Sequence, residues 1–299
     1  MLLRIIAIIF PIFAIVAAGW LYARYRGKLS GDGHGIDMAF ANQLNMEIFV
    51  PALVFAAMTA KSFDLAAYDR LAFAATLVIL GSGAIAWLVA RLLKEQANTF
   101  VPPMMFTNSG NMGLPLAVLA FGESALPAAV VLFFVENTLH YTLGTWMLDH
   151  KARLTNLWRV PVIFAALVAL AINFAGLELW LPLYTAIKLL GDVAIPLLLF
   201  SLGVRLATST WSDVRLGLIG AVVCPASGML IAWAATPLFG LEGRDAAMLM
   251  VFGALPPAVL NFVFAERYRQ EPAKVASIVM IGNLGALVFV PLALVMTLQ

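Results

Sequence analysis

Apolar residues along the chain fall into ten long blocks separated by short polar connections. A helix needs about 20 apolar residues to cross the hydrocarbon core of a bilayer. No connection between the blocks is long enough to hold a soluble domain. The pattern therefore predicts an all-α integral membrane protein with ten transmembrane helices. The expected spans lie near residues 2–23, 36–60, 70–92, 98–121, 125–147, 159–177, 183–207, 214–239, 245–266 and 272–298.

The span near 98–121 contains residues that interrupt a helix. Two glycines, a proline and two asparagines within eight residues are poor material for a continuous helix. A broken helix at bilayer depth is tolerated only against protein or a water-filled cavity. We expect a break here that forms half of a substrate site; packing glycines, a proline kink and core asparagines are the structural alternative. The residues concerned are Asn108, Ser109, Gly110, Asn111, Gly113 and Pro115.

The chain also carries an internal repeat. At a shift of 145 residues, residues 47–55 superpose on residues 192–200 with an acid, a proline and a phenylalanine in common, and Pro127 meets Pro272. Five crossings reverse the direction of entry, so the two halves must be inverted in the membrane. Inverted repeats with broken helices in corresponding places are the architecture of secondary transporters. The expected repeats are residues 1–153 (helices 1–5) and residues 154–299 (helices 6–10).

The repeat predicts a partner break about 145 residues beyond Gly110, in the span near 245–266. Pro256 and Pro257 lie there. Adjacent prolines remove two N–H donors and clash with the preceding turn, so this helix is expected to open at residues 254–255.

Composition and charge refine this picture. Of 299 residues, 63% are hydrophobic and 11% are charged, and the mean hydropathy is +0.97, far from the values of a soluble domain. The single cysteine, Cys224, excludes an internal disulfide and a multi-cysteine metal site.

Connections after odd-numbered spans hold thirteen lysines and arginines, against four on the opposite side, which places both termini outside the cytoplasm. The thirteen are Arg24, Arg26, Lys28, Arg91, Lys94, Lys151, Arg153, Arg159, Arg205, Arg215, Arg267, Arg269 and Lys274, and the four are Arg4, Lys61, Arg70 and Arg244.

The two interrupted segments resemble those of the auxin efflux carrier family, which includes plant PIN-type carriers and bacterial dicarboxylate carriers. Residues 108–115 are similar to the family's Asn…Gly-x-Pro-Leu break in helix 4. Thr107 stands where the PIN-type carriers have a proline, and this chain lacks their long central loop, so the likeness is to the bacterial members. The second likeness consists of Ala254, Leu255 and Pro256, then residues 262–268, then Pro272, Ser277 and Gly282.

The resemblance implies a fold like that of the bile-acid sodium symporters. A scaffold domain (helices 1, 2, 6 and 7) would hold a transport domain (helices 3–5 and 8–10) that moves like an elevator. The crossing of helices 4 and 9 would form the substrate site at residues 108–113 and 255–257. We expect a secondary active transporter of small organic anions in a bacterial inner membrane, with malate, malonate or an auxin-like carboxylate as the cargo that the resemblance suggests.

Two crossed, broken helices suit an anionic cargo. The half-helix after each break presents unpaired N–H groups and the positive end of its dipole, worth about 0.3–1 kcal/mol at a surface and up to about 2 when partly buried. Amide and hydroxyl side chains can add hydrogen-bond donors. The candidate substrate-binding residues are Asn108, Ser109, Gly110, Asn111, Gly113, Leu255, Pro256, Pro257, Asn45 and Asn137.

Three acidic residues at bilayer depth are candidates for ion coupling: Glu136, Glu47 and Asp192. A charge at the centre of a membrane helix costs about 2.5–3.5 kcal/mol on insertion scales. Desolvation favours the neutral form of a carboxyl group, which suits proton coupling. Neighbouring asparagines provide oxygen ligands for Na⁺ instead, near Glu136 and Asn111. Lys188, one helical turn before Asp192, offers simple neutralisation as the alternative for that residue.

An intramembrane enzyme and an anion channel are the alternatives to a transporter. An intramembrane enzyme could use Glu136, His140 and Ser109, although the i, i+4 spacing of Glu136 and His140 lacks a metalloprotease pattern. An anion channel is a further alternative. We expect no enzymatic activity, no resident cofactor or metal, no nucleic-acid partner, and coupling to H⁺ or Na⁺ in a lipid bilayer. A homodimer, the direction of transport and the exact substrate stay open.

Overall fold

The structure, a computed structural model, describes residues 2–30, 38–60, 63, 65–150, 159–208 and 212–297. Within these ranges the chain is helical, and its only strand-like feature is one isolated antiparallel bridge between Thr107 and Pro257. The all-α class is therefore confirmed for this part of the chain. The boundary between the two expected repeats lies outside the described residues, as do Lys61, Lys151 and Arg153 of the charge count.

The helices are continuous in some places and interrupted by single turns of other types elsewhere. Up to residue 150 they are α1 (Leu2–Ser30), α2 (Ala39–Leu44), η1 (Asn45–Phe49), α3 (Val50–Met58), η2 (Leu65–Tyr68), α4 (Asp69–Leu93), α5 (Ala97–Met105), η3 (Ser109–Gly113), α6 (Leu114–Phe121), η4 (Glu123–Ala125), α7 (Leu126–Leu139), η5 (His140–Gly144) and α8 (Thr145–Leu148). From residue 159 they are α9 (Pro161–Phe174), α10 (Leu181–Asp192), α11 (Ala194–Thr208), α12 (Val214–Leu238), α13 (Gly243–Gly253), α14 (Val259–Arg267) and α15 (Pro272–Thr297). The turns η1, η3 and η5 are π-helical.

Seven helical stretches of the described chain are long and apolar enough to cross a membrane, judged by length and composition. They coincide with seven of the expected spans. The exceptions are the spans near 98–121, 159–177 and 245–266. The second of these is α9, with 14 residues. The other two are divided into α5 with α6 and α13 with α14. The predicted breaks therefore explain why two apolar segments do not form long helices.

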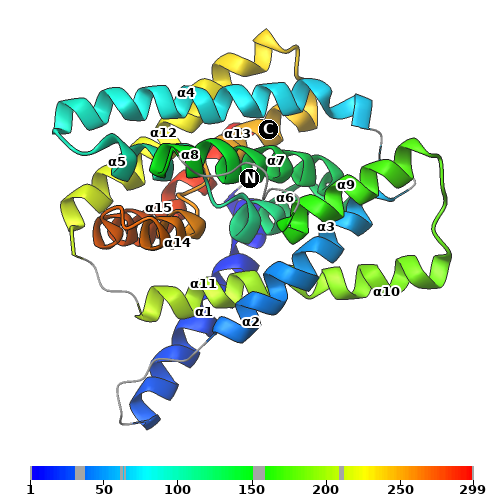
Figure 1. Cartoon of the computed structure of the whole chain (residues 1–299), viewed down its shortest axis with the longest axis horizontal. Coiled ribbons are helices and arrows are strands. Elements are labelled where there is room, and N and C mark those ends of the chain that lie inside the picture. Colours follow the sequence, from blue (N-terminus) through cyan, green and yellow to red (C-terminus); the bar gives the residue numbers. More distant parts are fainter. Residues whose placement is uncertain are drawn as a thin grey trace.

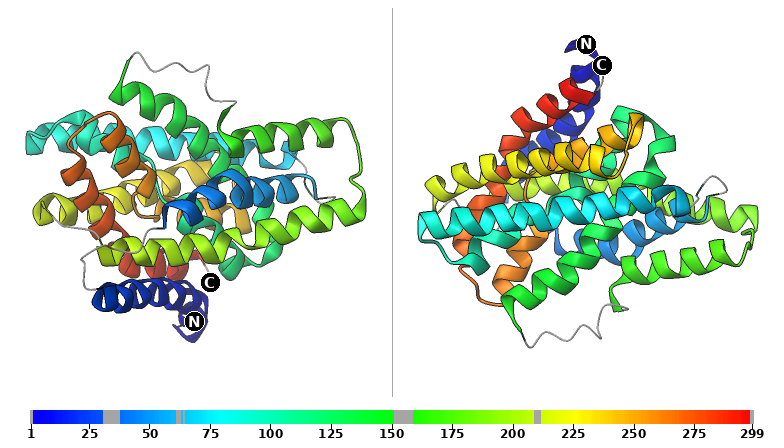
Figure 2. Two further views of the ribbon diagram at one scale, coloured as in Figure 1. Left: turned by 60° about the horizontal axis from the view of Figure 1, so that its bottom comes forward. Right: turned by 90° about the horizontal axis from the view of Figure 1, so that it is seen from above.

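The long helix α4 lies across one face of the molecule, and it packs against α5, α12 and α13 (Figure 1). On the opposite side α1 packs along α11 and projects away from the other helices. Both views in Figure 2 show the start of α1 beside the end of α15. This placement is consistent with the expectation that both termini lie on one side of a membrane.

The two segments that superpose in the sequence are interrupted at corresponding places. The π-turn η1 separates α2 from α3, and α10 ends at Asp192 just before α11 begins at Ala194. Asn45 Nδ2 donates to Ala194 O at 3.4 Å. A Cβ on Gly191 would lie 2.7 Å from the Leu53 backbone. The small residue at position 191 thus lets the two interrupted helices cross in direct contact.

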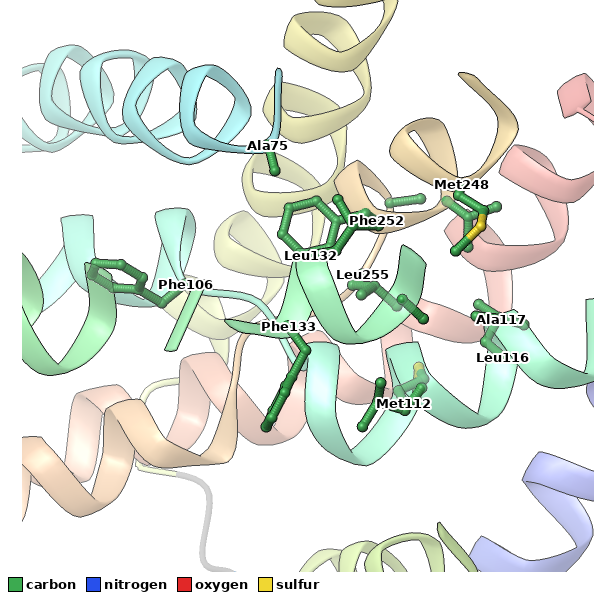
Figure 3. Close-up of a cluster of buried hydrophobic side chains, with 14 of the residues drawn as sticks. Ala75, Phe106, Met112, Leu116, Ala117, Leu132, Phe133, Met248, Phe252 and Leu255 are labelled. Carbon is green, nitrogen blue, oxygen red and sulfur yellow. The ribbon is translucent and has the colours of Figure 1, made fainter. Parts of the chain in front are cut away.

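Apolar side chains from α7 and α13 surround the second break. Figure 3 shows Leu255 close to Leu132 and Phe252, and all three side chains are buried. The backbones of α12 and α13 also touch, because a Cβ on Gly253 would lie only 2.5 Å from Gly228 O. This close contact lies at the last residue of α13, directly before the break.

Candidate functional site

The first break lies slightly before the residues that the sequence suggested. The helix α5 ends at Met105, and residues 106–108 are non-helical. Gly110 and Gly113 lie within the π-turn η3, which continues into α6, and Pro115 occupies the first turn of α6. The sequence therefore located the interruption but assigned it to residues that begin the next helix.

The second break lies where the adjacent prolines placed it. The helix α13 ends at Gly253, α14 begins at Val259, and residues 254–258 are non-helical. Pro256 and Pro257 have no N–H to donate, so this segment contributes mainly carbonyl groups. The predicted opening at residues 254–255 is confirmed.

The two breaks cross each other as a short antiparallel pair. The Asn108 N–H donates to Pro256 O at 2.7 Å, and the Ala258 N–H donates to Phe106 O at 3.0 Å. Backbone groups released from the helices thereby satisfy one another inside the protein, as a buried break requires. The expectation that the break near 98–121 meets its partner is confirmed, and we call this pair of segments, residues 106–108 and 254–258, the crossing.

Open N–H groups begin the helix that follows the first break. The Asn108 carbonyl accepts hydrogen bonds from the N–H groups of Met112 at 3.0 Å and Gly113 at 3.1 Å. The Asn108 side chain, in the N-cap position, makes no capping hydrogen bond. Within the described residues the N–H groups of residues 109–111 have no hydrogen-bond acceptor. Such a terminus attracts anions through its free N–H groups and its dipole.

Glu136 of α7 is buried against the first break, with 1% of its surface exposed. Its Oε2 accepts a hydrogen bond from Thr107 Oγ1 at 3.1 Å, and the Ser109 side chain lies beside the same carboxyl group. Among the acidic residues that the structure describes, Glu136 alone is buried. The crossing thus has a buried acidic group hydrogen-bonded to its polar segment.

Small residues in η3 allow close packing around the crossing. A Cβ on Gly110 would lie 2.9 Å from the Phe133 ring, and a Cβ on Gly113 would lie 2.9 Å from Leu255. Asn111 is part-buried, and its side chain makes no hydrogen bond within the described chain. Its amide is therefore available to a ligand.

A small cavity adjoins the crossing. It has a volume of about 20 Å³, which is room for about one water molecule. Ser109 is the polar residue in its lining, and the other lining residues are apolar or glycine. Figure 3 shows Ala117, Leu132 and Met248 around this region. An organic acid needs far more room, so its binding requires the surrounding helices to move apart.

Four predicted residues lie apart from the hydrogen bonds of the crossing. Glu47 is exposed and accepts a hydrogen bond from Gln43 at 3.0 Å. Asp192 is paired with Lys188 at 2.9 Å, with half of each side chain exposed, as the neutralisation alternative anticipated. The remaining two are asparagines: Asn45 contacts α11, as described above, and Asn137 Nδ2 donates to Phe133 O of its own helix at 2.9 Å.

Glu136, His140 and Ser109, the residues of the enzyme alternative, do not form a catalytic arrangement. The His140 ring stacks on the Phe106 ring with centroids 4.2 Å apart and contacts Phe264 edge-on. His140 Nε2 is buried and has no hydrogen-bond partner in the described chain. Since His140 Nε2 has no partner, no serine–histidine pair forms among the described residues. The described residues also contain no group of three His, Cys, Asp or Glu side chains that could hold a metal ion.

Two asparagines that the sequence analysis did not select hold the crossing in place. Asn283 of α15 accepts from Asn108 Nδ2 at 2.8 Å and donates from its own Nδ2 to Pro257 O at 3.0 Å. Asn261 of α14 donates from Nδ2 to Phe106 O at 2.9 Å. The sequence contains an indication of both residues, because each is a polar amide inside an apolar span. Such an amide is costly to bury unless its hydrogen bonds are satisfied.

Comparisons with known proteins agree with the membrane setting. The family model described as "Membrane transport protein" matches residues 4–156 and 151–294. A putative malonate transporter of Rhizobium meliloti (strain 1021) is 26% identical over 303 residues, which cover 94% of this chain and 92% of that protein. An uncharacterized transporter of Methanocaldococcus jannaschii is 22% identical, covering 84% of this chain and 87% of that protein. Auxin efflux carrier component 6 of Arabidopsis thaliana is 25% identical over 57% of this chain and 29% of its own length.

Proposed function

Because this chain belongs to the membrane transport protein family, which includes the auxin efflux carriers, we propose that it is a secondary active transporter of small organic anions. Membership of this family makes it an integral membrane transporter with a small-molecule substrate, not an enzyme. The similarity to a putative malonate transporter over nearly the whole length of both chains supports a small dicarboxylate as cargo. An auxin-like monocarboxylate is the second cargo class.

The proposed architecture has ten crossings arranged as two inverted repeats of five. The two pairs of interrupted helices support it: α2–α3 crosses α10–α11, and α5–α6 crosses α13–α14. In this proposal the second pair belongs to a transport domain that moves past a scaffold containing the first pair. The uneven distribution of positive residues supports both termini lying outside the cytoplasm of a bacterial inner membrane.

The proposed substrate site lies at the crossing. The substrate carboxylate would accept hydrogen bonds from the open N–H groups of residues 109–111, with the Asn111 amide as a further donor. A partly buried helix terminus contributes up to about 2 kcal/mol to binding an anion. No fixed positive charge is needed, and a site without one also releases its anion more easily.

Glu136 is the proposed coupling residue, because it is buried and accepts a hydrogen bond from Thr107, next to the segment with those N–H groups. A substrate anion that binds next to it would favour its protonation, or a Na⁺ ion bound to its oxygens. Either event would link ion binding to substrate binding. Glu47 and Asp192, which lie on the other pair of interrupted helices, are not needed for this role.

Uptake by proteoliposomes tests the proposal. The purified protein is reconstituted, and labelled malonate and malate are supplied with the pH and Na⁺ gradients varied independently. We expect saturable uptake and counterflow of unchanged substrate, about tenfold weaker binding in Asn111→Ala from the loss of a hydrogen bond to a charged group, and little change in Asn173→Ala, whose amide lies on α9. Uptake without saturation or counterflow would indicate a channel. Equal affinity in Asn111→Ala and the wild type would contradict the proposed site.

A further inference from the structure

The orientation of one amide determines what the crossing offers to a ligand. Asn283 Nδ2 donates to Pro257 O at 3.0 Å and to Val279 O at 2.8 Å. Backbone carbonyl oxygens only accept hydrogen bonds, so the NH₂ group of Asn283 must face these two atoms. Asn283 Oδ1 therefore faces the other way, where Asn108 Nδ2 donates to it at 2.8 Å. Neither amide can be flipped without losing hydrogen bonds.

Asn108 is thereby prevented from capping its own helix. An asparagine at the N-cap normally turns its Oδ1 onto the N–H groups of the first turn. Here Asn283 holds the amide by Nδ2, and no capping hydrogen bond is made. The N–H groups of residues 109–111 stay open as a result, and Asn108 Oδ1 accepts no hydrogen bond within the described part of the chain.

The hydroxyl groups nearby face Glu136. Thr107 Oγ1 donates to Glu136 at 3.1 Å, and the Ser109 side chain lies beside the same carboxyl group. A ligand at the crossing therefore meets two different groups side by side. The open N–H groups of residues 109–111 suit a carboxylate, whereas Asn108 Oδ1 is an acceptor, which suits an O–H or N–H group and not a second carboxylate oxygen.

We propose that Asn283 is a positioning residue that sets substrate specificity: by holding Asn108 through Nδ2, it makes the crossing select carboxylates that carry a hydrogen-bond donor close to the carboxylate group. The donor is a hydroxyl on the neighbouring carbon or a protonated second acid group. This inference rests on the proposed function, since it assumes that the crossing binds the transported anion. A site with an unpaired acceptor discriminates against analogues that lack the donor, because the acceptor then loses its solvation without replacement.

Matched ligand pairs measure this selectivity in proteoliposomes. Malate and succinate differ by one hydroxyl, and malonamate and monomethyl malonate differ by a donor at the second acid group. The wild type should show a KM about 3- to 10-fold lower for the donor-bearing member of at least one pair, as expected for one hydrogen bond. Preference within the first pair identifies the hydroxyl as the donor, and preference within the second identifies the second acid group.

Four variants, one of them a control, separate positioning from a structural role. In Asn283→Leu and in Asn108→Leu the KM ratio within the selective pair should fall to about 1, while Asn173→Leu keeps the wild-type ratio. Because each ratio is taken within a single protein, a smaller folded fraction does not change it. Asn283→Ser should also lose selectivity, because its hydroxyl can still donate to Val279 O but is too short to reach Asn108. This variant keeps the test valid if Asn283→Leu misfolds.

The outcomes are distinguishable from failure of the proposed function. If the wild type takes up none of the four acids in a saturable manner, the proposed transport of organic anions is wrong. If uptake saturates but neither pair is discriminated, or if Asn283→Leu and Asn283→Ser keep the wild-type ratio, the role of Asn283 is wrong. The wild type could instead bind acids with and without a donor equally well, and bind all of them more tightly in Na⁺. That result would make Asn108 Oδ1 an ion ligand and would also overturn the inference.

Discussion

The two breaks that form the crossing differ in chemistry although they occupy corresponding places. Residues 106–108 and the turn after them carry hydroxyl and amide side chains, a buried carboxyl partner and open N–H groups. Residues 254–258 are Ala, Leu, Pro, Pro and Ala. The Leu255 side chain is buried in the apolar cluster of Figure 3, and the two prolines offer carbonyl oxygens only.

This difference shows how one architecture can divide its tasks between two halves. The first break provides the groups that a ligand can reach. The second provides shape, and its carbonyl groups satisfy the backbone of the first and orient Asn283. Substitutions in the first half should therefore change binding and coupling, whereas substitutions around the second should change stability and geometry.

The largest expected effect comes from Glu136, the buried partner of the polar break. Glu136→Leu leaves the buried Thr107 hydroxyl without an acceptor, at about 1–3 kcal/mol, and removes the proposed coupling group, so uptake should fall at least about 10-fold. Glu136→Gln keeps an acceptor oxygen and should fold and bind substrate but lose concentrative uptake. Glu123→Gln, at an exposed site in η4, is the control. Wild-type accumulation by Glu136→Leu would remove Glu136 from the mechanism.

The next effect tests whether the second break acts through shape. A Cβ on Gly282 would lie 2.6 Å from the rigid Pro257 ring, so Gly282→Ala should push the crossing apart and cost about 1–3 kcal/mol. On the same helix, a Cβ on Gly285 would lie 3.2 Å from Ala221, and Gly285→Ala should cost less. Thermal unfolding in detergent compares the two variants. Equal melting temperatures would show that Gly282 is not tightly constrained by Pro257.

A smaller effect is expected from Asn261, which supports the second half. Asn261→Leu removes the hydrogen bonds to Phe106 O and Ala258 O, each worth about 0.5–1.5 kcal/mol. The melting temperature should fall, but the preference among carboxylic acids should stay at the wild-type value, unlike in Asn283→Leu. A change in that preference would mean that both halves determine specificity.

The smallest effect concerns contacts that join the two halves away from the crossing. Glu271, before α15, accepts from Lys274 at 2.8 Å and from Thr99 of α5 at 2.5 Å. The hydrogen bond from Lys274, and then that from Thr99, lowers the pKa of Glu271 below its usual value of 4.5. A lowered pKa in the folded protein stabilises it above pH 4.5, and this stabilisation disappears as the pH falls through the lowered value.

Thermal unfolding between pH 3 and pH 6 measures this contribution. Glu271→Gln should reduce the loss of stability on acidification, whereas Glu242→Gln, at an exposed position before α13, should leave it unchanged. The effect is small because Glu271 is partly exposed and solvent screens the interaction. Identical acid profiles for Glu271→Gln and the wild type would show that this contact does not stabilise the fold.

The sequence by itself determined the all-α membrane class, both interruptions and the likeness to a transporter family. These properties depend on local signals: the length of apolar runs, adjacent prolines such as Pro256 and Pro257, and glycines that weaken a helix. The repeat also related the two interruptions, since it compares segments of the same chain. The exact start of the first break was missed because Pro115 has the same composition signal whether it ends a helix or begins one.

Only the tertiary structure decided which atoms meet. Asn108 and Asn283 are 175 positions apart, and no local pattern shows that the amide of one turns the other away from its helix terminus. The structure likewise separated Glu136, buried at the crossing, from Glu47 and Asp192, which are exposed elsewhere. Three acids in apolar spans look alike in sequence, because burial and hydrogen-bond partners are set by how distant helices pack.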